Sequence, residues 1–335
     1  MTSSTPGGKS GRSSRMSGTG SIKCCIISFA GAFSSNPETS RRASTEFGIA
    51  DSRACGDFAE LLRSEAALPE DQRIDFVSIA TPNHTHYAIA KAAMEAGFHV
   101  VCDKPMTNSL EQASELVRLV ADTGSVLVVT HAYAGYPLVS QIREMIAAGE
   151  IGDVLAVRVE YLQGGVWREQ PGQPPTRAAW KRDPAKTGPS GTLGDIGTHA
   201  YHLLRYCTGL LPESLSCTLG NFHPARPLDD YGQVVFRFPG GAIGSLVCSQ
   251  VSHGRLNDLR IEVDGTQASL VWSQQQHDQL MVRRHAQPTQ IYEANRRGDH
   301  LAAAAKARCR LPGGHPEGFL EAFANLYTCL LYTSP

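Results

Sequence analysis

The sequence lacks several features that would mark other classes of protein. No apolar run approaches the roughly 18 residues that a membrane-spanning helix needs. The formal net charge is −1, so no basic field supports binding to nucleic acid. The nine cysteines are odd in number and include no C-x-x-C pair. Because most of them lie in apolar runs, they are typical of buried, reduced thiols in a cytoplasmic protein rather than of a disulfide framework.

The chain also lacks a visible strand and glycine-rich loop ahead of its first strand-like stretch. Residues 1–21 are rich in serine and glycine and contain no acidic residue, which predicts a disordered basic segment. A transit peptide has a similar composition, but this segment has almost no apolar helical face. The stretch CCIISFAGAFSSNPETSRRAS at 24–44 then reads as a strand, a turn and the start of a helix.

Strands and helices alternate from residue 22 to about residue 150. The expected strands are 24–33, 74–82, 98–105 and 125–133, and the expected helices are 37–47, 85–97, 109–124 and 137–149. Gly97 and Gly124 mark helix ends, and Ser109 with Gln112 forms a capping box. Near-continuous Val/Ile strands between helices predict a parallel α/β domain over 22–150, with ligands beyond the carboxyl ends of the strands.

After residue 150 the apolar pattern changes to period two. Residues 154–162 alternate, and two hairpins are expected, one around Pro239-Gly240-Gly241 and one around Asp264-Gly265. These are the signals of antiparallel strands with one covered face. The 335 residues favour two domains, so we expect an α+β domain with a largely antiparallel sheet over 151–335.

The first chemically interesting stretch is ATPNHTH at 80–86. Pro82 ends a strand, and Asn83 and His86 fall in the turn and first helical turn, where free N–H groups can face a phosphate or ribose. An ordinary strand–helix junction is the alternative. A metal pair at His84 and His86 is a third interpretation. No metal is expected, because residues two apart on a helix point in different directions and no acidic or cysteine ligand is near.

The second stretch is CDKP at 102–105. Asp103 and Lys104 directly follow a buried strand, and Pro105 turns the chain away. A partly desolvated ammonium at this position can orient a hydroxyl and lower the pKa of that hydroxyl. The alternative is a surface lysine in a loop.

The third stretch is SGTLGDIGTHAYHLLRYCTG at 190–209, which predicts a helix ended by Gly209. Asp195 and His199 are four residues apart and should project from one side. A carboxylate beside an imidazole makes a base that works near neutral pH, whereas the alternative is a helix cap and a core histidine. His202 has no such acid and is expected to pack. Proton removal from a hydroxyl beside a nucleotide crevice also needs a hydride acceptor, which a nicotinamide cofactor supplies.

The chain resembles the Gfo/Idh/MocA family of oxidoreductases, which includes inositol and sugar dehydrogenases. The resemblance runs from about Ala30 to about Tyr327 and rests on the order and spacing of several segments: AGAFSSNPETS, SIATPNHTHYAIAKAAMEAGFHVVCDKP, MIAAGEIGDVLAVRVEY, GTLGDIGTHAYHL and GHPEGFLEAFANLY. It implies a Rossmann-type domain and an NAD(P)-dependent dehydrogenase of a polyol, inositol or sugar. Relatives are commonly homo-oligomers, and the open face of the second-domain sheet is the expected interface.

The resemblance also implies roles for individual residues. Lys104 matches the lysine that binds the substrate hydroxyl and faces the nicotinamide, His199 the histidine that takes the hydroxyl proton, and Asp195 the acid that supports it. The expected cofactor-binding residues are Ser34, Thr81, Pro82, Asn83, His86, Asp103, Lys104 and Pro105. Ser34 stands where an acid often holds the ribose, and Arg41 and Arg42 follow, so NAD and NADP both remain open. Expected substrate-pocket residues are Trp167, Arg177, Trp180 and Lys181.

Two departures from the family pattern bear on activity. Relatives place a first strand, a glycine-rich loop and a helix before the segment that matches Ala30. We therefore interpret 24–33 as the second strand, with the alternative that 22–30 is the first strand and Gly31 a remnant of the loop. The chain also ends soon after LEAFANLY, so both ends are expected to be replaced or truncated. The alternative function is a non-catalytic member that keeps the fold without cofactor turnover; a metal hydrolase using His84, His86, Asp195 and His199 ranks last.

Overall fold

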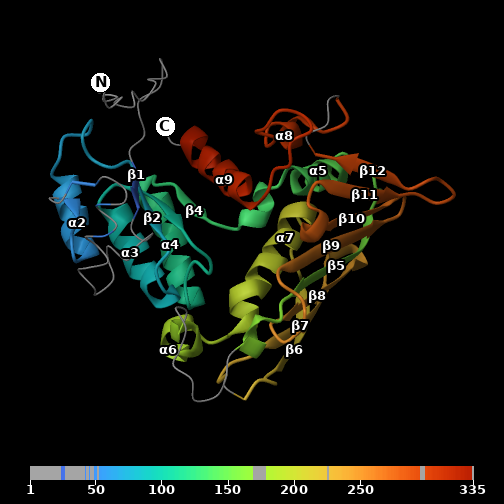
Figure 1. The fold of residues 1–335 in the computed structure, drawn as a ribbon, viewed down its shortest axis with the longest axis horizontal. Helices are drawn as coiled ribbons and strands as arrows, with labels where there is room; N and C mark the ends of the chain where they lie inside the picture. Colours follow the sequence, from blue (N-terminus) through green and yellow to red (C-terminus); the bar gives the residue numbers. More distant parts are fainter. Residues whose placement is uncertain are drawn as a thin grey trace, which may run out of the picture.

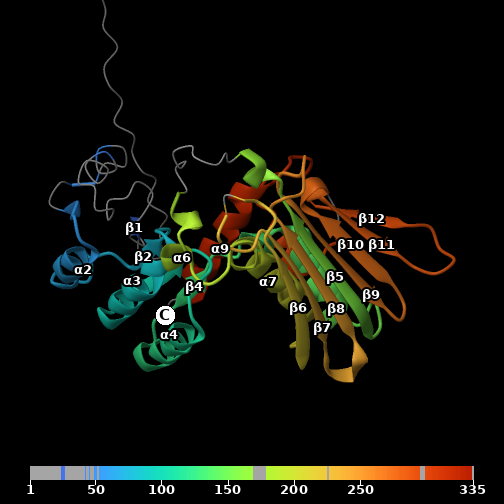
Figure 2. The same ribbon diagram turned by 90° about the horizontal axis from the view of Figure 1, so that it is seen from below.

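The computed structural model describes residues 24–26, 42, 45, 49–50, 53–168, 179–224, 226–294 and 299–333. It contains a four-stranded sheet in the order β1-β2-β3-β4 and an eight-stranded sheet in the order β12-β11-β10-β9-β5-β8-β7-β6. The two sheets form separate lobes, with helix α9 between them (Figure 1). The view from below shows the eight-stranded sheet as one broad layer with helices on the side that faces the other lobe (Figure 2).

The four-stranded sheet is parallel throughout, as predicted. Its strands are β1 (Cys24–Ile26), β2 (Phe76–Ile79), β3 (His99–Cys102) and β4 (Leu127–Val129). Helices α2 (Phe58–Ala66), α3 (Asn83–Glu95) and α4 (Leu110–Thr123) cover one face. The Ser109 hydroxyl accepts from the Gln112 N–H, and Gly124 ends α4 in the left-handed conformation. The helix expected over 37–47 lies almost wholly outside the described residues.

The position of β1 bears on the interpretation of the opening strand. Cys24, Cys25 and Ile26 pair in parallel with Phe76, Val77 and Ser78 of β2. In a doubly wound sheet the first strand lies between the second and the fourth, and the described sheet begins with β1 directly beside β2. This pairing is compatible with both interpretations of the segment: a second strand that takes the place of the first, or a first strand at 22–30. In either case it gives partners to N–H and C=O groups of β2 that would otherwise be unpaired.

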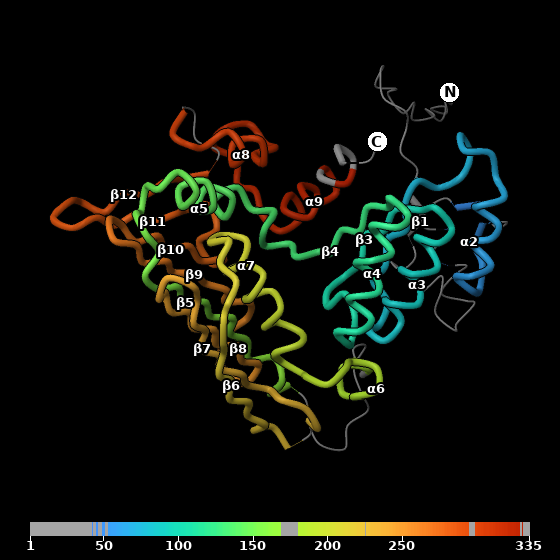
Figure 3. Tube along the Cα trace, turned by 180° about the vertical axis from the view of Figure 1, so that it is seen from behind, coloured from blue at the N-terminus to red at the C-terminus, as the bar shows by residue number. Residues whose placement is uncertain are grey.

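Helix α9 (Phe319–Thr333) covers the second face of this sheet, so a segment distant in sequence completes the first lobe (Figure 3). Phe76 of β2 and Val101 of β3 pack with Leu330, and the Ser78 hydroxyl lies 3.0 Å from the Tyr327 hydroxyl. Helix α9 also packs tightly against η2 (Ala132–Gly135), where a Cβ on Gly135 would lie 2.1 Å from the Ala322 carbonyl oxygen of α9. Only glycine fits there.

The larger sheet is largely antiparallel, as expected from the period-two pattern. Its strands are β5 (Val154–Leu162), β6 (Ser214–Gly220), β7 (Tyr231–Arg237), β8 (Ile243–Ser249), β9 (Asp258–Gly265), β10 (Ser269–Ser273), β11 (Gln279–Arg283) and β12 (Gln290–Glu293). The one parallel pairing in this sheet joins β5 and β8, and both expected hairpins, β7–β8 and β9–β10, are present.

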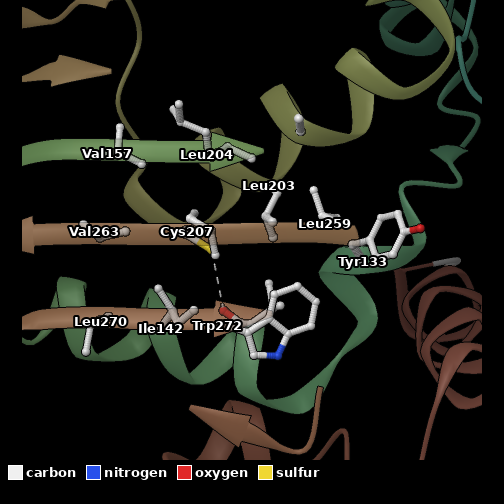
Figure 4. Close-up of a cluster of buried hydrophobic side chains, with 14 of the residues drawn as sticks. Tyr133, Ile142, Val157, Leu203, Leu204, Cys207, Leu259, Val263, Leu270 and Trp272 are labelled. Atoms are coloured by element: carbon white, nitrogen blue, oxygen red, sulfur yellow. Dashed lines mark hydrogen bonds between the residues drawn. The ribbon is translucent and has the colours of Figure 1, made fainter. Parts of the chain in front are cut away.

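The main core lies between this sheet and two helices, α5 (Pro137–Ala147) and α7 (Thr198–Thr208). Figure 4 shows Ile142 of α5 and Leu203 of α7 pointing toward the sheet near Trp272, and all three side chains are fully buried. The remaining short helices are α6 (Pro184–Thr187) and α8 (Ala303–Lys306). Within the described ranges, no helix has both the length and the apolar character needed to cross a membrane.

Candidate active site

The candidate site begins at the carboxyl edge of the parallel sheet. Cys102 of β3 pairs with Val129 of β4, so Asp103-Lys104 and Thr130-His131 follow the two strands at the same edge. The Asp103 carboxylate accepts from the Thr130 hydroxyl at 2.7 Å and from the Lys104 N–H at 2.8 Å. Asp103, expected to bind cofactor, thus fixes the shape of the loop that carries Lys104.

Lys104 and Asp195 are brought together from the two lobes. The Lys104 ammonium donates to Asp195 Oδ1 at 2.7 Å and to the Asp195 backbone carbonyl at 2.5 Å. The exposed fractions of the two side chains are 13% and 21%, so the pair is well shielded from water. The lysine therefore projects away from bulk solvent, as its position directly after a buried strand predicts.

The second oxygen of the Asp195 carboxylate is also engaged. Asp195 Oδ2 accepts from the Lys181 ammonium at 2.8 Å and from the Gln250 amide at 3.1 Å. Burial by itself would raise the pKa of Asp195, but Lys104 and Lys181 outweigh burial and hold this pKa well below its ordinary value. Asp195 is consequently a permanent anion that holds two ammonium groups.

The expected pairing of Asp195 with His199 involves no hydrogen bond among the described residues, although the Asp195 charge acts on the imidazole and raises its pKa. Asp195 lies in a π-helical segment, η5 (Leu193–Gly197), and His199 is the second residue of α7. A π-turn holds more residues than an α-turn, so the i, i+4 spacing of an α-helix does not by itself bring the two side chains into contact. The Asp195 carboxylate bonds to the lysines and Gln250, and His199 Nδ1 is buried with no hydrogen-bond partner among the described residues.

His199 is surrounded by rings instead. It packs edge-on against Tyr133, with 5.0 Å between ring centroids, and lies 6.2 Å from Tyr161. The two tyrosine hydroxyls hydrogen-bond to each other at 2.6 Å. Burial lowers the pKa of His199 well below its ordinary value, and the charge of Lys104 lowers it further. His199 is therefore a neutral imidazole at neutral pH.

The glycines of the 190–197 stretch allow the backbone to fold tightly around a buried acid. The Asp229 carboxylate accepts from the Ser190 hydroxyl and from the backbone N–H groups of Gly191 and Leu193. A Cβ on Gly191 would lie 2.4 Å from the Asp229 carbonyl oxygen. Asp229 thus secures the start of the segment that carries Asp195.

The expected cofactor loop after β2 is held to two neighbouring segments. His86 Nε2 lies 2.7 Å from the Thr81 carbonyl oxygen, and His86 Nδ1 lies 2.8 Å from the Pro105 carbonyl oxygen. The Asn83 amide donates to the Thr187 carbonyl at 2.9 Å, which links α3 to α6. The His86 ring nitrogens and the Asn83 amide thus position the loops. The sequence pattern does not reveal this role.

The described residues at the carboxyl edge of the parallel sheet fit the nicotinamide end of a dinucleotide. Pro82 precedes α3 and provides no side-chain cap; its carbonyl accepts from the Thr85 N–H at 2.9 Å, and the N–H groups of Asn83 and His84, at the very start of this 13-residue helix, are those that would face a ligand. The carboxyl edge of a parallel sheet is also where such folds bind nucleotides. Thr81, Pro82, Lys104 and Pro105 are the residues that would lie along the group. Ser34 and Arg41 fall outside the described residues.

Sequence reasoning missed several residues of the site. Gln250 carried no signal, because its partner Asp195 is 55 positions away. Lys181 was expected only as a substrate-pocket residue. His131 lies two residues after the end of the apolar strand β4, as Lys104 lies two residues after the end of β3, and this signal could have found it. Trp180 lies beneath the Lys181 ammonium, and Arg177 is outside the described residues. The described part of the chain contains no cluster of three or more histidine, cysteine or acidic residues suited to a metal ion.

Comparison with known proteins identifies the family. Residues 139–271 match the GFO/IDH/MocA C-terminal domain, and residues 12–131 match the oxidoreductase family with an NAD-binding Rossmann fold. The uncharacterized oxidoreductase YfiI of Bacillus subtilis is 33% identical over 300 residues, which is 89% of this chain and 75% of YfiI. The chain belongs to the Gfo/Idh/MocA family of oxidoreductases.

Family members whose names or structures specify a substrate have a similar sequence identity to this chain. An inositol dehydrogenase homologue of Azotobacter vinelandii, solved with NADH and myo-inositol, has a TM-score of 0.82 at 35% identity and covers 90% of this chain and 77% of its own. Levoglucosan dehydrogenase of Pseudarthrobacter phenanthrenivorans is 32% identical over 74% of this chain and 65% of its own length. The Rossmann-type sheet and the antiparallel sheet of this chain are those of the family.

Proposed function

We propose that this chain is an NAD(P)-dependent dehydrogenase of a polyol, inositol or sugar, with Lys104 and His199 at the reacting hydroxyl. The observation that carries the proposal is the bridge from Lys104 to Asp195, which joins the cofactor lobe to the helix that bears His199. Relatives that act on inositol and levoglucosan support the substrate class.

Each residue of the site has a distinct part in the proposed reaction. The Lys104 ammonium has three N–H donors, and one that is not used on Asp195 orients the substrate hydroxyl. Neutral His199 accepts the hydroxyl proton, since its low pKa leaves the imidazole unprotonated at pH 7. Asp195 positions both lysines. The nicotinamide, when bound, supplies the hydride acceptor.

The test is Lys104→Ala in the full chain, with NADH or NADPH formation followed on a panel of inositols, sugars and anhydrosugars. We expect turnover to fall by at least roughly a hundredfold, the usual scale for an acid–base group. Lys186→Ala is the matched control, because this lysine is 49% exposed and its ion pair with a described residue is the one with Asp183 across one helical turn. Unchanged turnover in Lys104→Ala, or an equal loss in the control, contradicts the assignment.

The choice between NAD and NADP is tested by comparing turnover with the two cofactors. The A. vinelandii homologue was solved with NADH, whereas a scyllo-inositol 2-dehydrogenase of B. subtilis, 26% identical over 55% of this chain and 51% of its own length, is named for NADP(+). A preference for NADP would assign Arg41 or Arg42 to the 2′-phosphate, and their alanine variants should then lose that preference selectively.

Assembly and location are part of the same proposal. The outer face of the eight-stranded sheet exposes Val235 and Ile243 beside a charged ladder around Arg158, which supports a homo-oligomer formed through this face. Light scattering that gives the mass of a single chain would contradict it.

The described cysteines Cys55, Cys102, Cys207, Cys217, Cys248 and Cys309 are free thiols, which supports a cytoplasmic enzyme. Recovery of the native protein from the medium or periplasm would contradict that location.

A further inference from the structure

Two buried imidazole nitrogens at the site have no hydrogen-bond partner among the described residues. They are Nδ1 of His199 and Nδ1 of His131. Buried polar atoms in folded proteins are nearly always paired, so an orphaned pair in a candidate active site calls for an explanation. The two rings are neighbours, with 5.7 Å between centroids and an interplanar angle of 86°.

His131 is held in place on three sides. Its ring stacks on His202 of α7 at 4.1 Å with an interplanar angle of 6°. Its backbone N–H donates to the Val129 carbonyl, and its carbonyl accepts from the Ala134 N–H. His131 therefore reaches from the carboxyl edge of the sheet to the catalytic helix, beside the loop that carries Lys104.

The other groups around His199 are already engaged. The Asp195 carboxylate bonds to two lysines and Gln250. The Tyr161 hydroxyl donates to the Asn257 side chain and shares a hydrogen bond with the Tyr133 hydroxyl. Of the described polar groups whose rings contact His199, His131 is the one with an unsatisfied nitrogen.

We propose that His131 is the positioning residue of His199, through an Nδ1-to-Nδ1 hydrogen bond that forms in the working enzyme. A neutral imidazole carries one donor and one acceptor, so a single N–H···N bond satisfies both orphaned atoms. Histidine ring torsions are broad, so rotation of His199 aims its Nδ1 at that of His131, and a shift of the ring by roughly half an ångström then brings the two atoms to hydrogen-bond distance. The bond sets the tautomer of His199 and leaves Nε2 free for the substrate proton.

This inference deepens the proposed function, because it names what orients the proton acceptor of the same site. Its first test needs no turnover: ¹⁵N-histidine NMR of the full chain, with and without NADH. We expect His131 and His199 to show complementary Nδ1 protonation and a nitrogen–nitrogen coupling across the bond, both absent in His131→Asn. Identical tautomers with no coupling in either state overturn the proposal. If the coupling is present but no polyol is oxidised, the pairing stands and the proposed function fails.

The second test separates the hydrogen bond from packing. His131→Phe keeps a ring on His202 but removes both nitrogens, and should lower kcat roughly ten- to a hundredfold with KM nearly unchanged, the loss expected for one unsatisfied buried group. His131→Asn places an amide near Nδ1 and should recover most of this loss. His202→Phe is the control and should change kcat by no more than about threefold. Equal activity of the phenylalanine and asparagine variants overturns the proposal; if neither folds, the NMR result decides.

Discussion

Replacing Asp195 with asparagine removes the negative charge that Lys104 and Lys181 share and leaves the shape of the side chain almost unchanged. Lys104 keeps the Asp195 backbone carbonyl as an acceptor, and Lys181 is 36% exposed and can regain water. The loss should therefore be smaller than the 3–5 kcal/mol of a fully buried broken pair. We expect Asp195→Asn to lower the free energy of unfolding by about 1–3 kcal/mol at pH 7.

The same variant predicts a pH dependence of definite sign. The folded-state pKa of Asp195 is depressed, so its stabilisation is present above the unfolded-state pKa and is lost as pH falls toward the folded value. The gap between wild type and Asp195→Asn should be constant from pH 7 to pH 5. It should then narrow by about 1 kcal/mol by pH 3, because the unfolded-state pKa is about 3.9.

Urea unfolding followed by tryptophan fluorescence measures this gap, since Trp272 is fully buried. Asp183→Asn makes the same chemical change at a half-exposed acid and should shift the free energy of unfolding by no more than about 0.5 kcal/mol. A gap that is the same at pH 3 and pH 7 would refute the reasoning, because the charge of Asp195 would then play no part. So would a gap no larger than that of the control.

Two further substitutions test the supports of the site. Gly135→Ala places a Cβ 2.1 Å from the Ala322 carbonyl oxygen and should cost about 1–3 kcal/mol of stability in urea unfolding, with wild-type stability as the contrary result. His86→Ala removes the ring that lies between the carbonyls of Thr81 and Pro105 and should weaken NADH binding on the order of tenfold by fluorescence titration, whereas unchanged affinity would show that the two loops hold their positions without it.

The order of elements in both lobes could be predicted because periodicity is a local property. The strands at 76–79 and 99–102, the glycine that ends α4 and the two hairpins all follow from patterns within a few residues. The place of β1 could not be predicted in this way. Strand order depends on which backbone groups need partners, and that is decided by the whole sheet.

The site could be predicted where reactive side chains lie at the ends of strands and helices. Lys104 follows a buried strand and Asp195 lies in the short helical segment before α7, and the structure joins them at 2.7 Å. The expected hydrogen bond between Asp195 and His199 is not among those of the described residues; the i, i+4 rule assumes an α-helix, and Leu193–Gly197 is a π-turn. The contact of Gln250 with Asp195 could not be predicted, because no residue near Gln250 in the sequence indicates it.

The amino-acid sequence by itself determined the two kinds of sheet, the family and the residue types at the strand ends, since each depends on local pattern or on the order of motifs. The tertiary structure alone decided that helix α9 completes the first sheet and that Asp195 serves two lysines. It alone also brought His131 against His199. Those outcomes depend on contacts between segments tens to hundreds of residues apart, which only the packing of the whole chain brings together.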